Sequence, residues 1–146
     1  MREIKFRAKD ILQGNWHYGS YLYTDNNVNN PYLTTPPVGK HQIFEYRAGD
    51  FLMGGWEGIE VSPETIGQFT GLYDKNRKEI YEGDIIRSFD SEGNSILHHV
   101  EYTGASFVAI LKDSFSFDRS VITQDWLKEF DKVVIGNIHD DKEYLI

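Results

Sequence analysis

The stretch from Ile66 to Arg87, IGQFTGLYDKNRKEIYEGDIIR, constrains the fold of this chain more than any other. Apolar and polar residues alternate on both sides of Asp74-Lys75-Asn76-Arg77, and that segment has the composition of a turn. The pattern predicts a β-hairpin with strands at 66–72 and 78–81. A Gly-Asp corner at 83–84 then leads into a further predicted strand at 85–89.

Short runs rich in β-branched and aromatic residues predict strands along the rest of the chain. These runs are 3–8, 16–23, 42–46, 96–102, 106–112 and 133–138. In the first run, Ile4, Phe6 and Ala8 are predicted to face the core, with Lys5 and Arg7 outward. The run 106–112 has apolar residues on both faces, which predicts a central strand.

The remaining regular elements are short. One helix is predicted within 120–131, beginning near Thr123 or Gln124, because Ile122, Trp126, Leu127 and Phe130 suit one helical face. Ser62-Pro63-Glu64-Thr65 predicts a single helical turn capped by Ser62. The glycines between 49 and 61 are interpreted as turn or bulge residues rather than as a phosphate-binding loop.

Together these elements predict an all-β or β-rich α+β fold. We expect a small, strongly bent sheet, or an SH3-like barrel formed by about 66–146, with the N-terminal strands added to it and one short helix. A chain of 146 residues has the length of one domain, so a single domain over 1–146 is expected. The proline-rich segment from about 24 to 40 is predicted to be a long loop, either a mobile or partner-contacting segment or an active-site lid.

Composition narrows the chemistry. With 0 Cys, a disulfide, a thiolate nucleophile and a cysteine zinc site are excluded. No apolar run approaches the roughly 20 residues that cross a bilayer, and the first residues lack the apolar region of a secretory signal. A cytoplasmic protein without membrane contact is therefore expected. The net charge of -8 disfavours sequence-independent binding to nucleic acid.

Two motifs resemble sites of metal binding or acid-base chemistry. Glu82 and Asp84 share one face of a strand, but no third oxygen ligand stands nearby, so we interpret them as solvated carboxylates at a strand edge. His98 and His99 alternate faces, so one is expected to pack and the other to be exposed, without a common metal ion. No metal, no cofactor and no catalytic residue is predicted.

The hairpin region 69–87 is a candidate interaction surface. Cationic and aromatic side chains that suit single-stranded nucleic acid are Lys75, Arg77, Lys78, Tyr81 and Arg87. Carboxylates at 74, 79, 82 and 84 alternate with them, which favours a hairpin of mixed charge whose aromatic residues pack.

Five segments of the chain resemble the YopX family of small bacteriophage and prophage proteins. They are MREIKFRA (1–8), GNWHYGS (14–20), SPETIGQFTGL (62–72), DKNRKEIYEGDIIR (74–87) and VIGNI (134–138), in the order and approximate spacing of the family. The region 24–56 lies outside the resemblance. Members often carry Asn-Gly where this chain has Asn76-Arg77, which places a left-handed conformation on Arg77 at a cost of roughly 1 kcal/mol. Lys9 stands where relatives often have Trp.

The resemblance implies a mainly β fold, phage or mobile-element origin, self-association, and no catalytic residues that could be transferred. The 3 Trp and 9 Tyr are residue types enriched at interfaces. We therefore expect a phage or prophage accessory protein that is a non-enzymatic binding or assembly module and acts as a homo-oligomer, with a host or phage protein as a further partner. The alternative is a nucleic-acid-associated protein that uses the hairpin 69–87.

Overall fold

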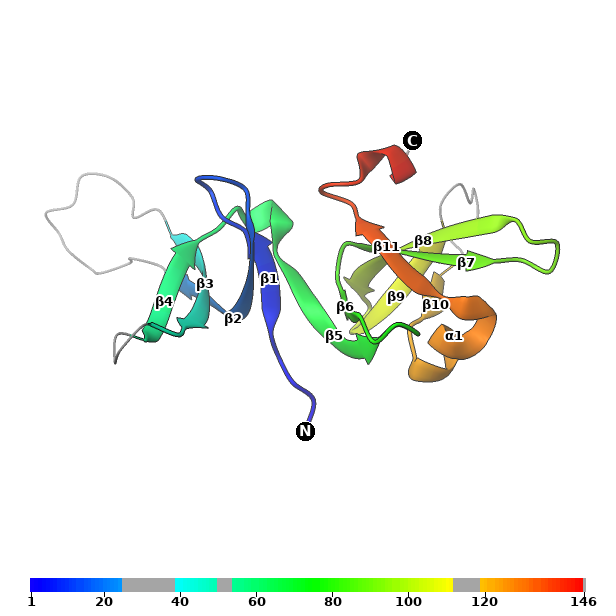
Figure 1. The fold of residues 1–146 in the computed structure, drawn as a ribbon, viewed down its shortest axis with the longest axis horizontal. Coiled ribbons are helices and arrows are strands. Elements are labelled where there is room, and N and C mark those ends of the chain that lie inside the picture. Colours follow the sequence, from blue (N-terminus) through cyan, green and yellow to red (C-terminus); the bar gives the residue numbers. More distant parts are fainter. Residues whose placement is uncertain (25–38, 50–53, 112–118, 146) are drawn as a thin grey trace, which may run out of the picture. The chain divides into compact units, whose positions relative to one another are not determined.

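The computed structural model describes residues 1–24, 39–49, 54–111 and 119–145 (Figure 1). The chain forms two compact units: an N-terminal unit, Ile4–Ile66, and a C-terminal unit made of Met1–Glu3 and Gly67–Ile146. Antiparallel strands dominate both units, so the predicted β-rich class is confirmed. The interpretation of 1–146 as one domain stays a prediction. None of the helices in the described ranges is long and apolar enough to span a membrane.

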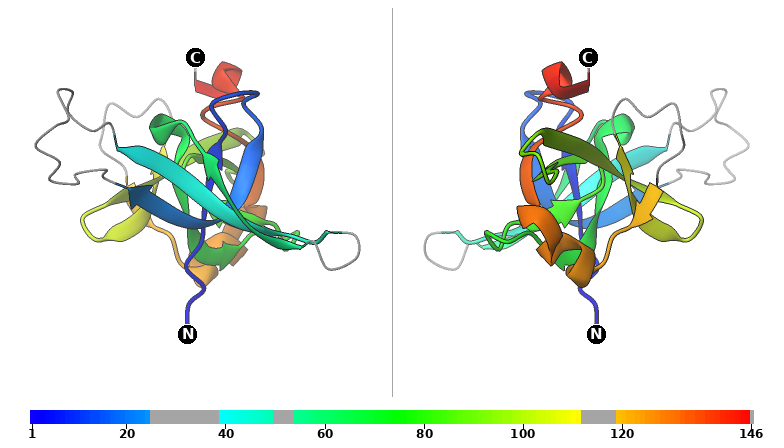
Figure 2. Two further views of the ribbon diagram at one scale, coloured as in Figure 1. Left: turned by 90° about the vertical axis from the view of Figure 1, so that its left-hand side faces the viewer. Right: turned by 90° about the vertical axis from the view of Figure 1, so that its right-hand side faces the viewer.

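The N-terminal unit is a four-stranded antiparallel sheet. Its elements are β1 (Phe6–Lys9), β2 (Trp16–Thr24), β3 (Lys40–Arg47), β4 (Gly55–Glu60) and the 3-10 turn η1 (Pro63–Thr65), with the strands in the order β4-β3-β2-β1. The long strands β2 and β3 are strongly twisted (Figure 2). An isolated bridge between Asp10 and Val61 joins the ends of β1 and β4. The sheet therefore curls back on itself at that end, around a core of Ala8, Ile43 and Val61.

Two predictions for β1 are wrong in detail. Ile4 lies before the strand begins and is exposed, because β1 pairs with β2 only from Phe6 onward. Arg7 was expected to point into solvent, but it is buried, and its guanidinium carbon lies 4.8 Å from the centre of the Trp16 ring. Cation–π attraction offsets part of the desolvation of a buried arginine.

The glycine-rich segment before η1 contains a strand, β4, and not only turns or bulges. Gly58 lies inside this strand with the Phe44 ring against it: a Cβ atom there would be 2.7 Å from Phe44 Cζ. The glycine thus makes room for an aromatic ring on the neighbouring strand. Most of the long loop predicted at 24–40 lies outside the described residues, so its two interpretations stay predictions.

The helical turn predicted at 62–65 is confirmed as η1, with Pro63 at its first positions. The expected cap is wrong, because the Ser62 side chain makes no capping hydrogen bond. Instead the Thr65 hydroxyl donates to the Ser62 carbonyl at 2.7 Å and accepts from the Lys9 amide at 2.9 Å. Thr65 therefore ties the turn to the end of β1.

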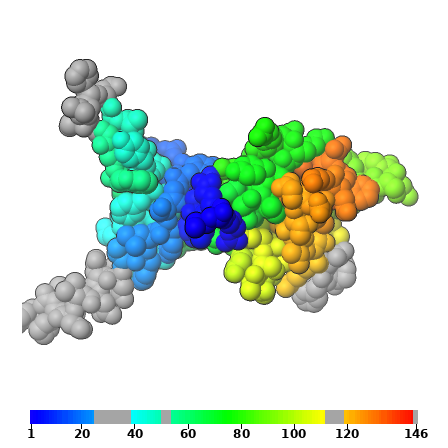
Figure 3. Space-filling model, turned by 90° about the horizontal axis from the view of Figure 1, so that it is seen from below, coloured from blue at the N-terminus to red at the C-terminus, as the bar shows by residue number. Residues whose placement is uncertain are grey.

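The C-terminal unit combines a hairpin with a five-stranded sheet. Its elements are β5 (Gly67–Tyr73), β6 (Glu79–Tyr81), β7 (Asp84–Phe89), β8 (Ser95–Thr103), β9 (Ser106–Leu111), β10 (Arg119–Val121), α1 (Gln124–Lys128), η2 (Glu129–Asp131), β11 (Val133–Asn137) and η3 (Lys142–Leu145). The hairpin is β5–β6, and the sheet order is β10-β9-β8-β7-β11. In the space-filling view, α1 (orange) lies beside β9 (yellow) (Figure 3). Closure of residues 66–146 into a barrel stays a prediction.

One core joins the hairpin, the sheet and the helix of this unit. Its buried members are Ile80, Ile86, Val100, Phe107, Ala109, Ile122, Leu127 and Val134. β9 contributes to it as an interior strand, although β8, not β9, is the middle strand of the five.

The predicted hairpin at 66–81 is confirmed, and its turn has a structural anchor. The buried carboxylate of Asp74 accepts from the backbone N–H groups of Asn76, Lys78 and Val134 at 2.8, 2.9 and 3.0 Å. Since Val134 belongs to β11, one side chain joins the turn to a strand 60 residues away. The predicted left-handed conformation at Arg77 is confirmed by a φ of 64°.

The helix prediction is confirmed but too long. Thr123 is the N-cap and accepts from the Trp126 amide at 3.1 Å, as its position near the start suggested. Ser120 instead belongs to β10, where it pairs with Ala109. The helical geometry ends before Phe130, whose φ of 54° is left-handed.

Candidate functional site

The outer side of the N-terminal sheet carries an exposed group of large side chains. Cross-strand register places even-numbered residues of β2, β3 and β4 on one face, where Tyr46 opposes Trp56. We call the group Tyr18, Leu22, Tyr46 and Trp56 the outer aromatic face. Trp56 is 69% exposed and Tyr46 is 61% exposed, and their rings meet edge to face at 5.8 Å. Exposed apolar groups of this kind are typical of contact surfaces.

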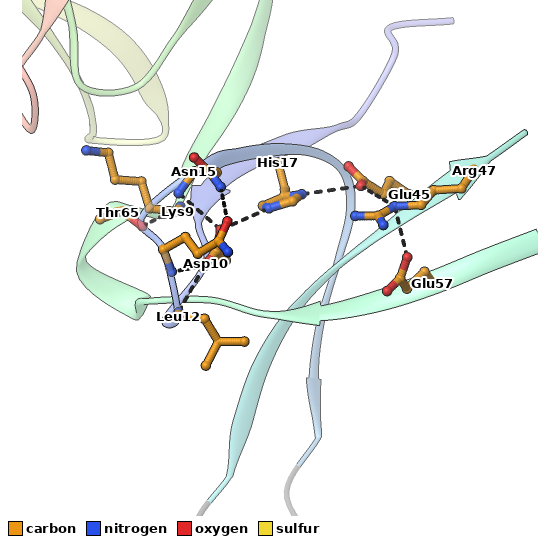
Figure 4. Close-up of polar contacts among 10 residues, drawn as sticks. Lys9, Asp10, Leu12, Asn15, His17, Glu45, Arg47, Glu57 and Thr65 are labelled. Carbon is orange, nitrogen blue, oxygen red and sulfur yellow. Dashed lines mark hydrogen bonds and ion pairs between the residues drawn. The ribbon is translucent and has the colours of Figure 1, made fainter.

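The opposite face of the same sheet carries a chain of polar contacts (Figure 4). His17 lies between two carboxylates: Nε2 is 3.2 Å from Asp10 Oδ2, and Nδ1 is 3.3 Å from Glu45 Oε1. Arg47 continues the chain, with Nε 3.2 Å from Glu45 and 2.9 Å from Glu57. Residues from β2, β3 and β4 are thus joined with the β1–β2 loop.

Asp10 organises that loop. Its carboxylate accepts from the backbone N–H groups of Gln13, Leu12 and Asn15 and contacts His17. The Gln13 amide above all, with His17 and the other two amides, lowers the Asp10 pKa to about 2, against the opposing effect of desolvation. A carboxylate that is held ionised in this way suits a structural anchor better than a proton donor.

An open hollow of about 490 Å³ lies beside this polar chain. Among its lining residues are Asp10, Leu12, His17, Arg47, Glu57 and Ile59. Carboxylates, one arginine and exposed apolar side chains stand together here, so the hollow can recognise a group that combines charge with an apolar stem.

Comparison with known protein families finds that the YopX model, described as YopX protein, matches residues 5–145. The chain belongs to the YopX family. The resemblance found in the sequence is therefore confirmed. Among solved structures, the crystal structure of protein EF1440 from Enterococcus faecalis is similar, at 25% sequence identity over 100% of both chains with a TM-score of 0.58. The curated proteins contain no match.

The structure of this YopX-family chain divides the five candidate residues of the hairpin region. Lys75, Arg77 and Lys78 are exposed, and the Lys75 amine lies 3.1 Å from Asp131. The Tyr81 ring is buried against Phe69, so it does not offer a surface on which a base could stack. Arg87 is half-buried, with its guanidinium 5.4 Å from the centre of the Phe89 ring. The use of these residues for nucleic acid stays a prediction.

Glu82 and Asp84 hold the corner between β6 and β7. Asp84 is buried and accepts from the Tyr81 amide at 2.8 Å, while Glu82 accepts from the Gln68 amide at 2.8 Å. Burial raises the pKa of Glu82, although backbone hydrogen bonds from Gln68 and Tyr102 oppose it. Both carboxylates thus serve backbone amides, which differs from the solvated strand edge that the sequence predicted.

The histidine pair lies on β8 with its rings on opposite faces. His98 packs edge to face on Trp126 at 5.4 Å, and His99 Nε2 is 2.8 Å from Glu101. Both are half-buried, so the expectation of one packed and one exposed ring is only partly met. Within the described residues, no group of three or more His, Cys, Asp or Glu could hold a metal ion.

A second hollow, of about 350 Å³, lies in the C-terminal unit beside Trp126 and Phe130. Lys132 is buried at its wall, 4.3 Å from the centre of the Trp126 ring, and its amine donates to the Glu129 carbonyl at 2.8 Å. Desolvation lowers the pKa of this amine. Because a lysine that binds the last carbonyls of a helix is a common end to that helix, we assign Lys132 a structural role.

Sequence reasoning missed the outer aromatic face and the polar chain for different reasons. The aromatic residues of β2 were recognised as strand formers, but their register with β3 and β4 was unknown. The polar chain joins Asp10, His17, Glu45 and Glu57, which come from separate segments without a common motif. The alternation of Tyr18, Ser20 and Leu22 was the one signal that could have indicated an apolar outer face.

Proposed function

We propose that this chain is a non-enzymatic binding or assembly module that self-associates through its outer aromatic face. The observation that carries the proposal is the high exposure of Tyr46 and Trp56 on one sheet face, together with Tyr18 and Leu22. Burial of a large aromatic side chain contributes roughly 1.5–3 kcal/mol. A second copy that covers this face would therefore gain binding energy from side chains that contribute little to the core.

Phage or prophage origin and a role in the cytoplasm of a bacterial host are further parts of the proposal. They are supported by what the resemblance to the YopX family implies, and a host or phage protein is a further partner that the same face would suit. The acidic net charge of -8 favours a protein partner over a phosphate backbone.

Light scattering after size-exclusion chromatography tests the proposal over a range of concentrations. We expect a mass that is a multiple of the monomer mass. The double variant Tyr46→Ser/Trp56→Ser should shift the population toward the monomer. The matched control is Phe130→Ser, which removes an aromatic ring that is 64% exposed in the C-terminal unit and should leave the mass unchanged.

Two results would contradict self-association through this face. One is a strict monomer at every concentration, and the other is an oligomer that the double variant leaves intact. A gel-shift assay with single-stranded DNA tests the alternative, a nucleic-acid-associated protein. It is done at low salt, because electrostatic binding is strongest there. If that complex forms and is weakened by Arg77→Glu, the hairpin 69–87 is the functional surface instead.

A further inference from the structure

Within the described residues, the outer edge of β4 has no backbone hydrogen bonds along most of its length. β4 is the last strand of the order β4-β3-β2-β1, and it pairs with β3 from Gly55 to Glu60. On its other side, the backbone hydrogen bonds within the described residues are confined to one end, where the Ile11 amide donates to the Glu60 carbonyl and Asp10 bridges to Val61. An exposed strand edge is a template for pairing with another strand.

The direction of the free backbone groups follows from those end contacts. The amide and carbonyl of one strand residue point to the same side of the strand, and that side alternates along the chain. The Glu60 carbonyl meets Ile11 on the outer side at 3.2 Å, whereas the Val61 amide donates to a carbonyl of β3 at 2.9 Å. The backbone groups of Trp56 and Gly58 therefore point outward, like those of Glu60.

The hollow of about 490 Å³ lies directly beside this edge, since Glu57, Gly58, Ile59 and Glu60 are among its lining residues. Its charge is predominantly negative. The hollow and the polar chain at its wall hold three carboxylates, Asp10, Glu45 and Glu57, against Arg47 and His17. A further lining carboxylate, Glu60, is paired with Lys40 at 3.0 Å. Exposed apolar side chains, Ile11 and Leu12, form part of the rim.

We propose that the outer edge of β4 binds an extended segment of a partner protein, which adds as a strand and places a lysine or arginine side chain in the acidic hollow. Main-chain hydrogen bonds to Trp56 and Gly58 supply affinity that is independent of sequence, and the hollow selects the side chain. The carboxylates attract the cationic head, and Leu12 covers its methylene stem. This site lies on a strand edge and the inner side of the sheet, so it goes beyond self-association through the outer aromatic face.

A second copy of this chain fits the same edge less well. β4 carries Glu57 and Glu60 and no cationic residue of its own, since their ion-pair partners Arg47 and Lys40 lie on β3. Pairing β4 with its copy would therefore bring four carboxylates to a shared edge. Like charges on facing strands are destabilising. The charge of the edge thus favours a basic segment over a copy of β4.

Peptide titration followed by amide NMR tests the proposal. The probe is an acetylated peptide of four Val-Lys repeats, and the matched peptide has four Val-Glu repeats. We expect the Val-Lys peptide to shift the Trp56 and Gly58 amides and to protect them from hydrogen exchange, and the Val-Glu peptide to bind about tenfold more weakly at low salt.

Variants at Gly58 distinguish the effect of losing the backbone N–H from the effect of adding a side chain. Gly58→Pro removes an outward N–H without removing a hydrogen bond to β3, and Gly58→Ala adds a similar Cβ atom against Phe44 but keeps the N–H. Gly58→Pro should weaken binding of the Val-Lys peptide by about tenfold relative to Gly58→Ala. If both Gly58 variants unfold, Glu57→Lys, at an exposed side chain, replaces them. It should weaken binding of the Val-Lys peptide and strengthen binding of the Val-Glu peptide.

Three results would overturn the proposal: equal binding of the two peptides, equal binding by Gly58→Pro and Gly58→Ala, or β4 amides that become protected with protein concentration alone in the double variant Tyr46→Ser/Trp56→Ser, which lacks the outer aromatic face. The last would show that a second copy occupies the edge. The double variant Tyr46→Ser/Trp56→Ser keeps the backbone of β4, so it should still bind the Val-Lys peptide even when it no longer self-associates. Failure of this proposal and failure of self-association are therefore distinguishable.

Discussion

The two units of this chain differ in how deeply their aromatic side chains are buried. In the C-terminal unit, Phe69, Tyr81 and Phe107 are buried, and the core joins a hairpin, a sheet and a helix. In the N-terminal unit, the fully buried cluster is Ala8, Ile43 and Val61, while Tyr46 and Trp56 project from the opposite face. Among the described residues, the fully buried aromatic side chains thus belong to the C-terminal unit, whereas the most exposed Tyr and Trp belong to the N-terminal unit. Tyr102 and Phe130 are exposed in the C-terminal unit as well.

The N-terminal sheet carries apolar side chains on its outer side as well as on its core-facing side. A sheet with one core-facing side and one solvated side normally alternates apolar and polar residues. β2 and β3 break that rule, because Tyr18, Leu22 and Tyr46 occupy positions on the outer side. Because these side chains are exposed and lie outside the buried cluster, we propose that they contact another molecule.

The largest expected effect is on the C-terminal core. Ile86 is fully buried in the middle of that core, so Ile86→Ala should lower the free energy of unfolding by about 3 kcal/mol through lost burial and the cavity left behind. Trp56→Ala, on the outer aromatic face, should change it by about 0.5 kcal/mol or less when measured on the monomer. Urea denaturation at low protein concentration measures both, and similar losses would remove the contrast between the units.

The turn of the central hairpin gives the next effect. Asp74→Ala leaves the amides of Asn76, Lys78 and Val134 without their acceptor, and the Val134 amide is buried, so we expect a loss of about 2 kcal/mol. The matched control is Asp90→Ala, in the β7–β8 turn, where the carboxylate accepts from Glu92 and Asn94 only within its own turn. A loss for Asp90→Ala as large as for Asp74→Ala would show that the link to β11 is unimportant.

A smaller effect of opposite sign is expected at Arg77. Its φ of 64° is unfavourable for a residue with a Cβ atom, so Arg77→Gly should stabilise the C-terminal unit by up to about 1 kcal/mol. Lys78→Gly, at the next residue, is the control and should destabilise it, because glycine there only adds freedom to the unfolded chain. Thermal unfolding of the two variants gives the comparison, and a destabilised Arg77→Gly would contradict it.

The smallest effects are on pH dependence, and they differ in sign between the units. The Asp10 pKa is lowered from 3.8 to about 2, so its carboxylate contributes stability above pH 3.8 that is lost as the pH falls toward 2. Burial raises the Glu82 pKa above 4.5, so the folded state holds that proton more tightly, and stability is lost as the pH rises through this range.

Matched amide substitutions measure these two contributions. Glu82→Gln should gain stability relative to the parent between pH 3 and pH 7, by less than about 1 kcal/mol because the side chain is partly solvated. Asp10→Asn should lose stability relative to the parent over the same interval. Unfolding curves at several pH values measure both changes. Stability changes of the same sign in both variants would contradict the opposite pKa shifts of Asp10 and Glu82.

Sequence patterns predicted those elements well that depend on residues close together in the chain. The hairpin at 66–81, the strand after it and the cap of the helix depend on turn residues and short-range hydrogen bonds, such as Thr123 to Trp126. The left-handed Arg77 was predictable because the turn type demands that conformation wherever the residue falls.

Features that depend on register could not be predicted in this way. β4 was missed as a strand because Gly54, Gly55 and Gly58 have low strand propensity, and its pairing with β3 overrides that preference. The Asp10–His17–Glu45 chain needs the β1–β2 loop, β2 and β3 in the correct alignment, and a one-residue shift would turn His17 to the other face. Candidate residues in one hairpin were visible, whereas a surface assembled from β2, β3 and β4 was not.

We propose above all that a second copy covers the outer aromatic face of the N-terminal unit. Hydroxyl-radical footprinting at increasing protein concentration measures side-chain exposure at each residue directly. We expect Tyr46 and Trp56 to lose reactivity toward hydroxyl radicals as the concentration rises. Phe130, which is similarly exposed in the C-terminal unit, should keep its reactivity. Constant reactivity of Tyr46 and Trp56 across a range in which the protein associates, or a loss confined to Phe130, would contradict it.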